Sequence, residues 1–256
     1  MAEDRDRNLV GGFIKGLRII EAFGTDHPRL TISDVSRATD MDRATCRRLL
    51  LTLVSLGYAE LEGKHFKLTP RILRLGYAYL HSASLPNVAQ PLLEQLAKET
   101  GESCSVSVLD GQSIVYVARA SRQRVMSINL NVGSRLPAYC SSMGRVLLAF
   151  MPADGAQALL AASDRQRFTP KTVVDMDGLM TELASIRTQS YAIVDEELEL
   201  GLRSIAVPVW NSRGVVVAAL NIGAQAARVS VADMRQTLLP CLLRVQDDLR
   251  RLLGPE

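Results

Sequence analysis

The sequence predicts an α+β protein in two parts, an N-terminal winged helix-turn-helix and a C-terminal domain with an antiparallel sheet flanked by helices. Three observations predict this fold. Apolar residues recur at helical spacing before about residue 57, a short hairpin pattern follows directly, and beyond residue 100 strand-like stretches alternate with helical ones. With 256 residues, the chain is long enough for two compact domains.

The first three expected helices have recognisable ends. Residues 12–24 place five apolar side chains at helical spacing: Phe13, Ile14, Leu17, Ile20 and Phe23. Thr31-Ile-Ser-Asp34 resembles a capping box that opens a second helix, which runs through about Ala38. Asp42 is a suitable N-cap for a third helix that ends at residue 55 or 56, before Gly57. Three helices with a tight turn at residues 39–41 have the spacing of a helix-turn-helix.

The third helix has two different faces. One face is apolar and is expected to pack inward, with Cys46, Leu49, Leu50 and Leu53. The other carries Ala44, Arg47 and Arg48, with Arg43 and Thr45 in the first turn. Arginines near the start of such a helix suit guanine edges or phosphates in duplex DNA. The alternative is that Arg48 only ties the helix to an acidic neighbour.

A basic hairpin is expected directly after this helix. Residues 58–68 alternate around Glu62-Gly63, which places Ala59, Leu61, Phe66 and Leu68 inward and Lys64, His65 and Lys67 outward. Residues 43–74 hold seven Lys or Arg and two Glu, whereas residues 84–256 hold 17 basic and 17 acidic groups. This asymmetry favours double-stranded DNA as the partner of the first part, with a solvated basic face as the alternative. Thr31 and Ser33 complete the expected DNA-contacting set of Arg43, Ala44, Thr45, Arg47, Arg48, Lys64, His65 and Lys67.

The remaining chain is expected to form a sensor. We predict a DNA-binding domain over residues 10–69, a linker helix over 70–84 and a ligand-binding, oligomerising domain over 85–253. Expected helices are 87–100, 142–151, 153–162, 177–189 and 230–252, and expected strands are 104–109, 113–120, 125–132, 204–210 and 215–222. Small α+β domains of this kind often bind small ligands.

The loop from Gly133 to Gly144 indicates where a ligand binds. It leaves a strand and enters a helix whose first free N–H groups belong to Ser142, Met143 and Gly144, and such a helix start binds carboxylates without a metal. Around this start we expect Ser141 and Ser142 to add hydroxyl donors, Arg135 a counter-charge and Tyr139 an aromatic wall. In the alternative interpretation, Ser141 is a plain N-cap and Arg135 a surface residue. Ala219 and Gly223 are small enough to leave space above a sheet.

Several function classes are disfavoured. The three histidines are His27, His65 and His81, so residues 82–256 lack the usual general base and any histidine ligand for a metal. Four scattered cysteines show no metal or redox spacing, and we expect no metal, no cofactor, no membrane span and a cytoplasmic location. The acidic cluster from Asp195 to Glu199 could supply a general acid and base, but it has no accompanying nucleophile with a base. A solvated turn before a strand explains the cluster equally well.

The segment Asp195-Glu-Glu-Leu-Glu-Leu-Gly-Leu-Arg-Ser-Ile-Ala-Val-Pro-Val209, together with the winged module, resembles the isocitrate lyase regulator (IclR) family. The resemblance spans about residues 10–252. Residues 13–23 and 133–148 look like the branch that regulates aromatic-acid catabolism through the β-ketoadipate pathway. This resemblance implies a GAF-like mixed α+β effector domain, a homodimer or dimer-of-dimers tetramer on a palindromic operator, and an effector such as protocatechuate, 4-hydroxybenzoate or β-ketoadipate.

The resemblance also implies a set of effector contacts. Carried over to this chain, they are Ser142, Met143, Val194 or Asp195, Ser204, Asn221 and Gly223. Some relatives have serines where Asn221 and Gly223 stand here, a difference that affects the identity of the effector. Two other functions remain open: a ligand-independent architectural DNA-binding protein, and an enzyme that acts on a small acid.

Overall fold

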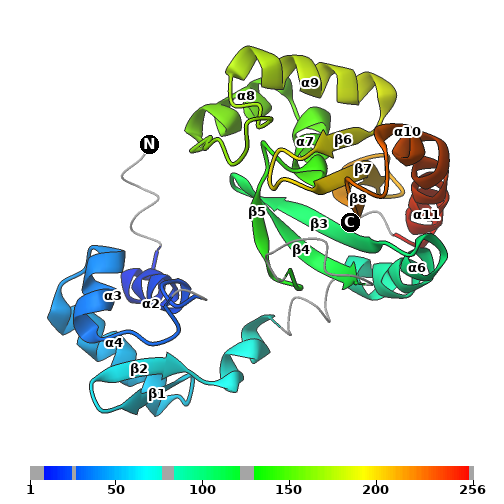
Figure 1. Cartoon of the computed structure of the whole chain (residues 1–256). Helices are drawn as coiled ribbons and strands as arrows, with labels where there is room; N and C mark the ends of the chain where they lie inside the picture. The colour runs from blue at the N-terminus through cyan, green and yellow to red at the C-terminus, as the bar shows by residue number, and fades with distance from the viewer. Residues whose placement is uncertain (1–8, 25–26, 77–83, 122–129, 254–256) are drawn as a thin grey trace. The chain divides into compact units, whose positions relative to one another are not determined.

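The computed structural model describes residues 9–24, 27–76, 84–121 and 130–253. The chain divides into two compact units, Met1–Tyr79 and Leu80–Glu256. The first holds helices and a hairpin, and the second holds a six-stranded sheet with helices on both faces (Figure 1). Within the described ranges, none of the helices has the length and apolar character that a bilayer crossing requires.

The first unit is a winged helix-turn-helix, as the sequence predicts. Its elements are α2 (Gly11–Glu21), α3 (Ile32–Thr39), α4 (Arg43–Ser55), β1 (Ala59–Glu62), β2 (His65–Leu68) and the short η1 (Pro70–Ile72). Thr31 and Asp34 form the predicted capping box, with reciprocal side-chain to backbone hydrogen bonds. Asp42 caps α4 by accepting a hydrogen bond from the Thr45 N–H at 2.8 Å. Both helix starts are therefore fixed by local side chains.

Three apolar residues that the helix and hairpin patterns of this unit indicate are exposed: Phe13, Leu17 and Leu61. The core contains Ile19, Leu30, Val35, Cys46, Leu50, Leu53, Ala59 and Phe66. On α2, the side chain of Ile19 is fully buried, but Phe13 and Leu17 are 67% and 40% exposed, because only the second half of this helix joins the core. Leu61 is also exposed, since it borders an open cavity of the unit and not the core.

The second unit starts with a long helix and continues through the sheet. Its elements are α6 (Ser84–Thr100), β3 (Ser103–Asp110), β4 (Ser113–Ala120), β5 (Arg135–Pro137), α7 (Ser142–Phe150), α8 (Ala153–Ala162), α9 (Met176–Gln189), β6 (Ala192–Asp195), β7 (Leu202–Trp210), β8 (Val216–Gln225), α10 (Val231–Asp233), the π-helical η2 (Met234–Leu238) and α11 (Leu239–Leu252). Much of the predicted linker helix lies outside the described residues, which resume at residue 84.

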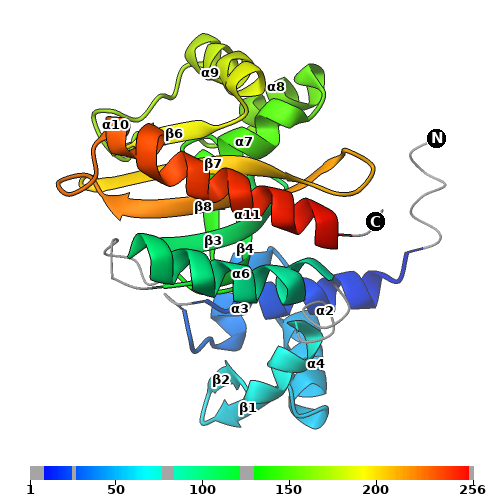
Figure 2. The same ribbon diagram turned by 90° about the vertical axis from the view of Figure 1, so that its right-hand side faces the viewer.

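The sheet of the second unit is antiparallel throughout and divides its core in two. Its strand order is β5-β4-β3-β8-β7-β6. Helices α6 and α11 pack on one face around an apolar cluster that includes Val106, Leu220 and Leu242 (Figure 2). Helices α7 and α9 belong to the cluster on the other face, which includes Met143 and Leu183. This second face is the one that forms a pocket.

Three local features differ from the expectations. Most of the predicted strand over 125–132 lies outside the described residues, which resume at residue 130. Residues 130–132 are not in a strand. Strands β5 and β6 were not predicted, since three or four residues carry little alternation. The expected closing helix contains the π-helical turn η2 just before Pro240. A proline donates no backbone hydrogen bond, and the wider turn accommodates its ring.

Candidate functional site

The exposed face of α4 carries unpaired cations. Arg43, Arg47 and Arg48 are exposed, whereas Cys46 and Leu50 on the opposite side are fully buried. Among the residues that the structure describes, none of these three arginines takes part in an ion pair; the cations of this unit that do are Arg29, Arg37 and Lys67. The alternative role of Arg48, a tie to an acidic neighbour, therefore finds no partner in this structure. The guanidinium groups remain available to an anionic ligand.

An open cavity lies between the start of α3, the helix α4 and the hairpin. Its lining is Thr31, Ile32, Ser33, Arg47, Leu51, Leu61, Gly63, Lys64 and Phe66. Four residues of the expected DNA-contacting set thus meet around one cavity: Thr31, Ser33, Arg47 and Lys64. The N-terminus of α3 adds the positive end of a helix dipole, which favours a phosphate.

The hairpin also carries its own counter-charges. The Lys67 ammonium lies 2.7 Å from a Glu60 carboxylate oxygen and 3.7 Å from Glu62, and its hydrogen bond to Glu60 raises the pKa of Lys67. Arg29 lies 3.1 Å from Glu62. Lys67 is therefore a weaker candidate for DNA contact than the sequence indicated, and Lys64 is the hairpin cation that has no ion pair among the described residues.

The second candidate site is a pocket on the α7 side of the sheet. Part of its polar floor comes from β3, where serine alternates with apolar residues, side chains alternate between the two faces, and Ser103 lines the pocket. Ser105 is in register with Arg119 on β4 and Asn221 on β8. Gly223 on β8 is in register with Ser204 on β7. The floor therefore consists of small and polar side chains over three or more adjacent strands.

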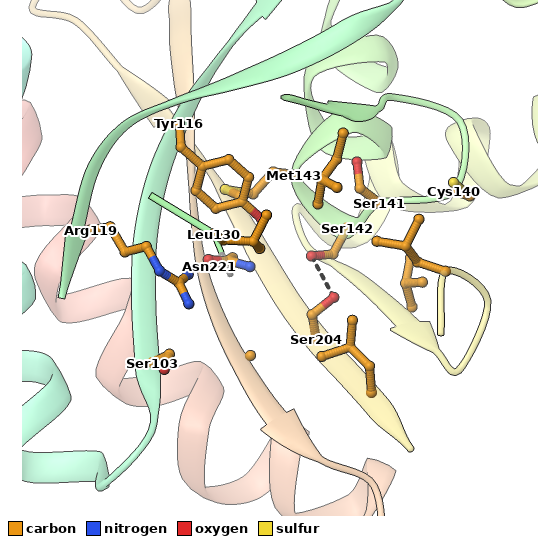
Figure 3. A pocket seen from close by; sticks show the side chains of 15 residues that line it. Ser103, Tyr116, Arg119, Leu130, Cys140, Ser141, Ser142, Met143, Ser204 and Asn221 are labelled. Carbon is orange, nitrogen blue, oxygen red and sulfur yellow. Dashed lines mark hydrogen bonds between the residues drawn. The ribbon is translucent and has the colours of Figure 1, made fainter. Parts of the chain in front are cut away.

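The wall of the pocket is the first turn of α7. The Ser141 hydroxyl accepts a hydrogen bond from the Gly144 N–H at 3.3 Å and so caps the helix. Ser142 then reaches across the pocket, and its hydroxyl oxygen lies 2.9 Å from that of Ser204, as the dashed line in Figure 3 shows. The Ser107 hydroxyl donates to the Met143 sulfur at 3.2 Å. The helix start is thereby fixed to the sheet floor.

Arg119 is the cation of this pocket. Its Nη1 donates to the Ser105 hydroxyl at 2.8 Å, and its guanidinium carbon lies 5.8 Å from the centre of the Tyr116 ring. Among the described residues, its buried Nε has no hydrogen-bond partner, and no carboxylate forms an ion pair with it. Burial lowers the pKa of Arg119. A half-buried guanidinium whose Nε is shielded from water and which has no counter-charge among the described residues is costly, and a bound anion would offset that cost.

Asn221 adds a second buried polar group without a partner. The side chain is 8% exposed, and its Oδ1 has no hydrogen bond among the described residues. In Figure 3, Arg119 and Asn221 lie on the same side of the pocket, opposite Ser142 and Ser204. The cavity volume of the pocket is about 40 Å³ in this structure, below the several hundred Å³ of most small-molecule sites, so a ring-sized ligand requires the lining side chains to move apart.

The predicted effector residues are only partly brought together here. The pocket lining includes seven of them: Ser141, Ser142, Met143, Val194, Ser204, Asn221 and Gly223. It also includes residues that the sequence did not indicate, among them Ser103, Tyr116 and Arg119. The other four expected residues, Arg135, Tyr139, Gly144 and Asp195, are absent from the lining.

The two charged residues of that group are engaged elsewhere. Arg135 is half exposed, and its guanidinium lies 2.5 Å from the Asp110 carboxylate and 2.9 Å from the Asp110 carbonyl oxygen. The expectation that Arg135 supplies the counter-charge of the pocket is therefore corrected in favour of Arg119. Asp195 accepts a hydrogen bond from Arg203 at 2.7 Å, and this bond keeps the pKa of Asp195 below its usual value.

The other two residues have packing roles. The Tyr139 side chain is fully buried, and its hydroxyl donates to the Gln166 carbonyl oxygen at 2.6 Å, so it is not a wall of the pocket. Gly144 lies directly against the backbone of Ala138, where an added Cβ would come within 2.3 Å of a carbonyl oxygen. Glycine is thus required at this position for close approach of helix and loop.

The pocket offers little for acid–base or covalent chemistry. Its lining among the described residues contains no histidine, aspartate or glutamate. Burial raises the pKa of the Cys140 thiol to about 12 and that of Tyr116 to about 12, so both stay protonated near neutral pH. Within the same part of the chain, no group of three His, Cys, Asp or Glu residues is placed to hold a metal ion.

A winged helix-turn-helix joined to a pocket-bearing domain defines the class of ligand-responsive DNA-binding proteins. Comparison with known proteins gives the family. Residues 14–63 match the IclR helix-turn-helix domain, and residues 77–251 match the bacterial transcriptional regulator IclR C-terminal domain. The chain belongs to the IclR family of transcriptional regulators.

Individual relatives lie in the branch that the sequence resembles. The chain is 41% identical to the Pca regulon regulatory protein of Pseudomonas putida, over 95% of this chain and 84% of that protein. It is 38% identical to the p-hydroxybenzoate hydroxylase transcriptional activator of Acinetobacter baylyi, over 98% of this chain and 94% of that protein. A crystal structure of an IclR homolog complexed with 4-hydroxybenzoate, from Microbacterium hydrocarbonoxydans, is similar with a TM-score of 0.77 and 27% identity, over 94% of this chain and all of that one.

Proposed function

We propose that this protein is a transcriptional regulator whose DNA binding responds to an aromatic carboxylate, such as a hydroxybenzoate, held in the pocket of the second unit. The observation that carries the proposal is Arg119, a half-buried arginine whose buried Nε has no hydrogen-bond partner and whose guanidinium has no carboxylate partner among the described residues. A ligand carboxylate would complete its hydrogen bonds. The names of the relatives and the 4-hydroxybenzoate bound to a similar structure support the same ligand class.

The pocket also suits the remainder of such a ligand. Tyr116, Leu130 and Leu136 provide apolar surface for a ring, and the hydroxyl pair of Ser142 and Ser204 provides polar groups opposite Arg119. The absence of a general base from the described lining favours binding over turnover. We therefore infer a sensor and not an enzyme.

The proposal assigns a role to each part of the chain. Residues 10–69 bind an operator, residues 70–84 connect the two parts, and residues 85–253 bind the effector and oligomerise. We infer that the protein binds a palindromic operator as a dimer or tetramer, because the symmetry of an operator usually matches the symmetry of the protein that binds it. The same proposal places the protein in the cytoplasm. Effector binding shifts the population of two conformations that differ in operator affinity.

One titration tests the proposal. An operator is first selected from a library of random duplexes, and its affinity is then measured by fluorescence anisotropy with and without 4-hydroxybenzoate and 3,4-dihydroxybenzoate. We expect one of these acids to change operator affinity by about 5- to 150-fold, the usual range of coupling between two sites. An operator affinity that both acids leave unchanged would favour an architectural DNA-binding protein, and conversion of the acid to a product would favour an enzyme.

Arg47 gives a separate prediction for the DNA-binding surface. Because this exposed arginine borders the cavity between α3, α4 and the hairpin, Arg47→Ala is expected to weaken operator binding by about 1–3 kcal/mol. If Arg47 reads a base, sequence preference relaxes at one position; if it contacts a phosphate, all duplexes lose affinity alike. The matched control is Arg251→Ala on α11, which removes the same charge from an exposed side chain of the other unit. Equal losses in both variants would contradict a specific role of Arg47.

A further inference from the structure

A buried ion pair lies behind the pocket wall. Arg145 on α7 and Glu197 in the loop after β6 are 2% and 9% exposed at their side chains. The two guanidinium nitrogens Nη1 and Nη2 donate to the two carboxylate oxygens at 2.7 and 2.6 Å, a bidentate arrangement. The two residues are 52 positions apart in the sequence, and neither of them lines the pocket itself.

Both members of the pair are fully engaged by other groups. The Arg145 Nε donates to the Tyr139 carbonyl oxygen at 2.8 Å, and the Val173 N–H donates to the Glu197 carboxylate at 2.9 Å. The Thr172 hydroxyl donates to the Glu197 carbonyl oxygen at 2.5 Å. The pair therefore joins three segments: the loop before α7 with its first turns, the loop before α9, and the loop between β6 and β7.

Two of these segments contribute residues to the lining of the pocket. Ser142 and Met143 precede Arg145 by less than one helical turn, and Leu198 directly follows Glu197; all three line the pocket. We propose that Arg145 and Glu197 are positioning residues, which hold the first turn of α7 and the loop around Leu198 at the separation that an effector requires. This inference rests on the proposed function, because it concerns the same pocket.

General energetics support a role in geometry over a role in stability. Removing two charges from water costs about as much as their attraction returns, so a buried pair replaced by apolar side chains of similar size often leaves stability unchanged or increased. Apolar side chains, however, lack the fixed directions of two parallel hydrogen bonds. Replacing Arg145 and Glu197 together therefore tests their effect on the geometry of the pocket separately from their effect on the stability of the fold.

The test is the double variant Arg145→Met, Glu197→Met in the full chain. We expect it to fold, with a thermal midpoint close to that of the wild type, and to bind 4-hydroxybenzoate or 3,4-dihydroxybenzoate at least about tenfold more weakly in calorimetry, because misplaced polar groups lose most of their contact. Affinity within twofold of the wild type, in a folded double variant, would overturn the proposal.

A second variant covers the case in which the double variant does not fold. Thr172→Val removes the hydroxyl that donates to the Glu197 carbonyl oxygen and accepts from the Thr169 N–H, but it introduces no unpaired charge and keeps the shape of the side chain. We expect weaker effector binding in the same direction, and unchanged affinity would count against the proposal. The control is Asp110→Asn, which disrupts the exposed ion pair with Arg135 and should leave effector affinity unchanged.

A measurement without ligand makes the outcome independent of the effector class. Hydrogen exchange should be faster at the first turn of α7 and at residues 196–201 in either variant, and not in Asp110→Asn. If the wild type binds neither acid, the proposed function fails, while the exchange rates still decide whether the pair positions the two walls. Unchanged exchange in both segments would overturn the inference.

Discussion

Replacing Arg119 by methionine is expected to weaken the binding of 4-hydroxybenzoate by about 1.5–3 kcal/mol, which is roughly 10- to 150-fold, because a hydrogen bond to a charged group is lost. Methionine keeps much of the length and apolar surface of the arginine stem. It also removes a half-buried guanidinium that has no carboxylate partner among the described residues, so the free protein should lose little stability. Calorimetry gives the affinity, and thermal unfolding checks the fold.

The matched control removes the same charge from Arg135. This guanidinium is half exposed and paired with Asp110, and it does not line the pocket. Arg135→Met should therefore change effector affinity by less than about 0.5 kcal/mol, as expected for a surface substitution. If Arg135→Met lost affinity and Arg119→Met did not, the carboxylate would bind where the sequence first indicated.

The difference between these two arginines shows what local sequence can predict. The strand alternation of residues 113–120 places Tyr116 and Arg119 on opposite faces, since they are three positions apart. In the structure, Tyr116 is in register with Ser107 and Arg119 with Ser105, so Val117 is an extra residue of a β-bulge. The bulge returns Arg119 to the face of Tyr116. The face on which Arg119 lies is therefore decided by the register between β3 and β4, and no short sequence pattern predicts that register.

Features that depend on neighbouring residues were predicted well. The caps Thr31, Asp42 and Ser141 each accept a hydrogen bond from an N–H three positions later, so the residues that fix these helix starts stand together in the sequence. The winged helix-turn-helix and the pocket wall at Ser142 follow from such local signals. Strands β5 and β6, in contrast, are too short to show a period.

The environment of Glu197 differs clearly from the one that its neighbours in the sequence predict. As part of the acidic run from Asp195 to Glu199, it was interpreted as a solvated turn, yet its side chain is buried against Arg145. The neighbouring Glu196 behaves differently, because it binds the exposed Lys171. A partner 52 positions away distinguishes the two glutamates, and only the tertiary structure brings that partner to Glu197.

Replacing Glu197 alone by leucine is expected to lower the free energy of unfolding by about 3–5 kcal/mol, because Arg145 then stays buried without a counter-charge. The Val173 N–H would also lose its acceptor. Trp210, the one tryptophan of the chain, lies on β7, so its fluorescence during urea denaturation reports the unit that holds the pair.

The double variant Arg145→Met, Glu197→Met separates the cost of an uncompensated buried charge from the contribution of the ion pair itself. If the loss in Glu197→Leu comes from an uncompensated buried charge, removal of both charges should restore most of the lost stability, and the two single effects should not add. If the double variant were as unstable as the sum of its single variants, the ion pair itself would stabilise the fold. Stability that returns without effector affinity would instead show that the two charges serve the geometry of the pocket, at no net gain in folding free energy.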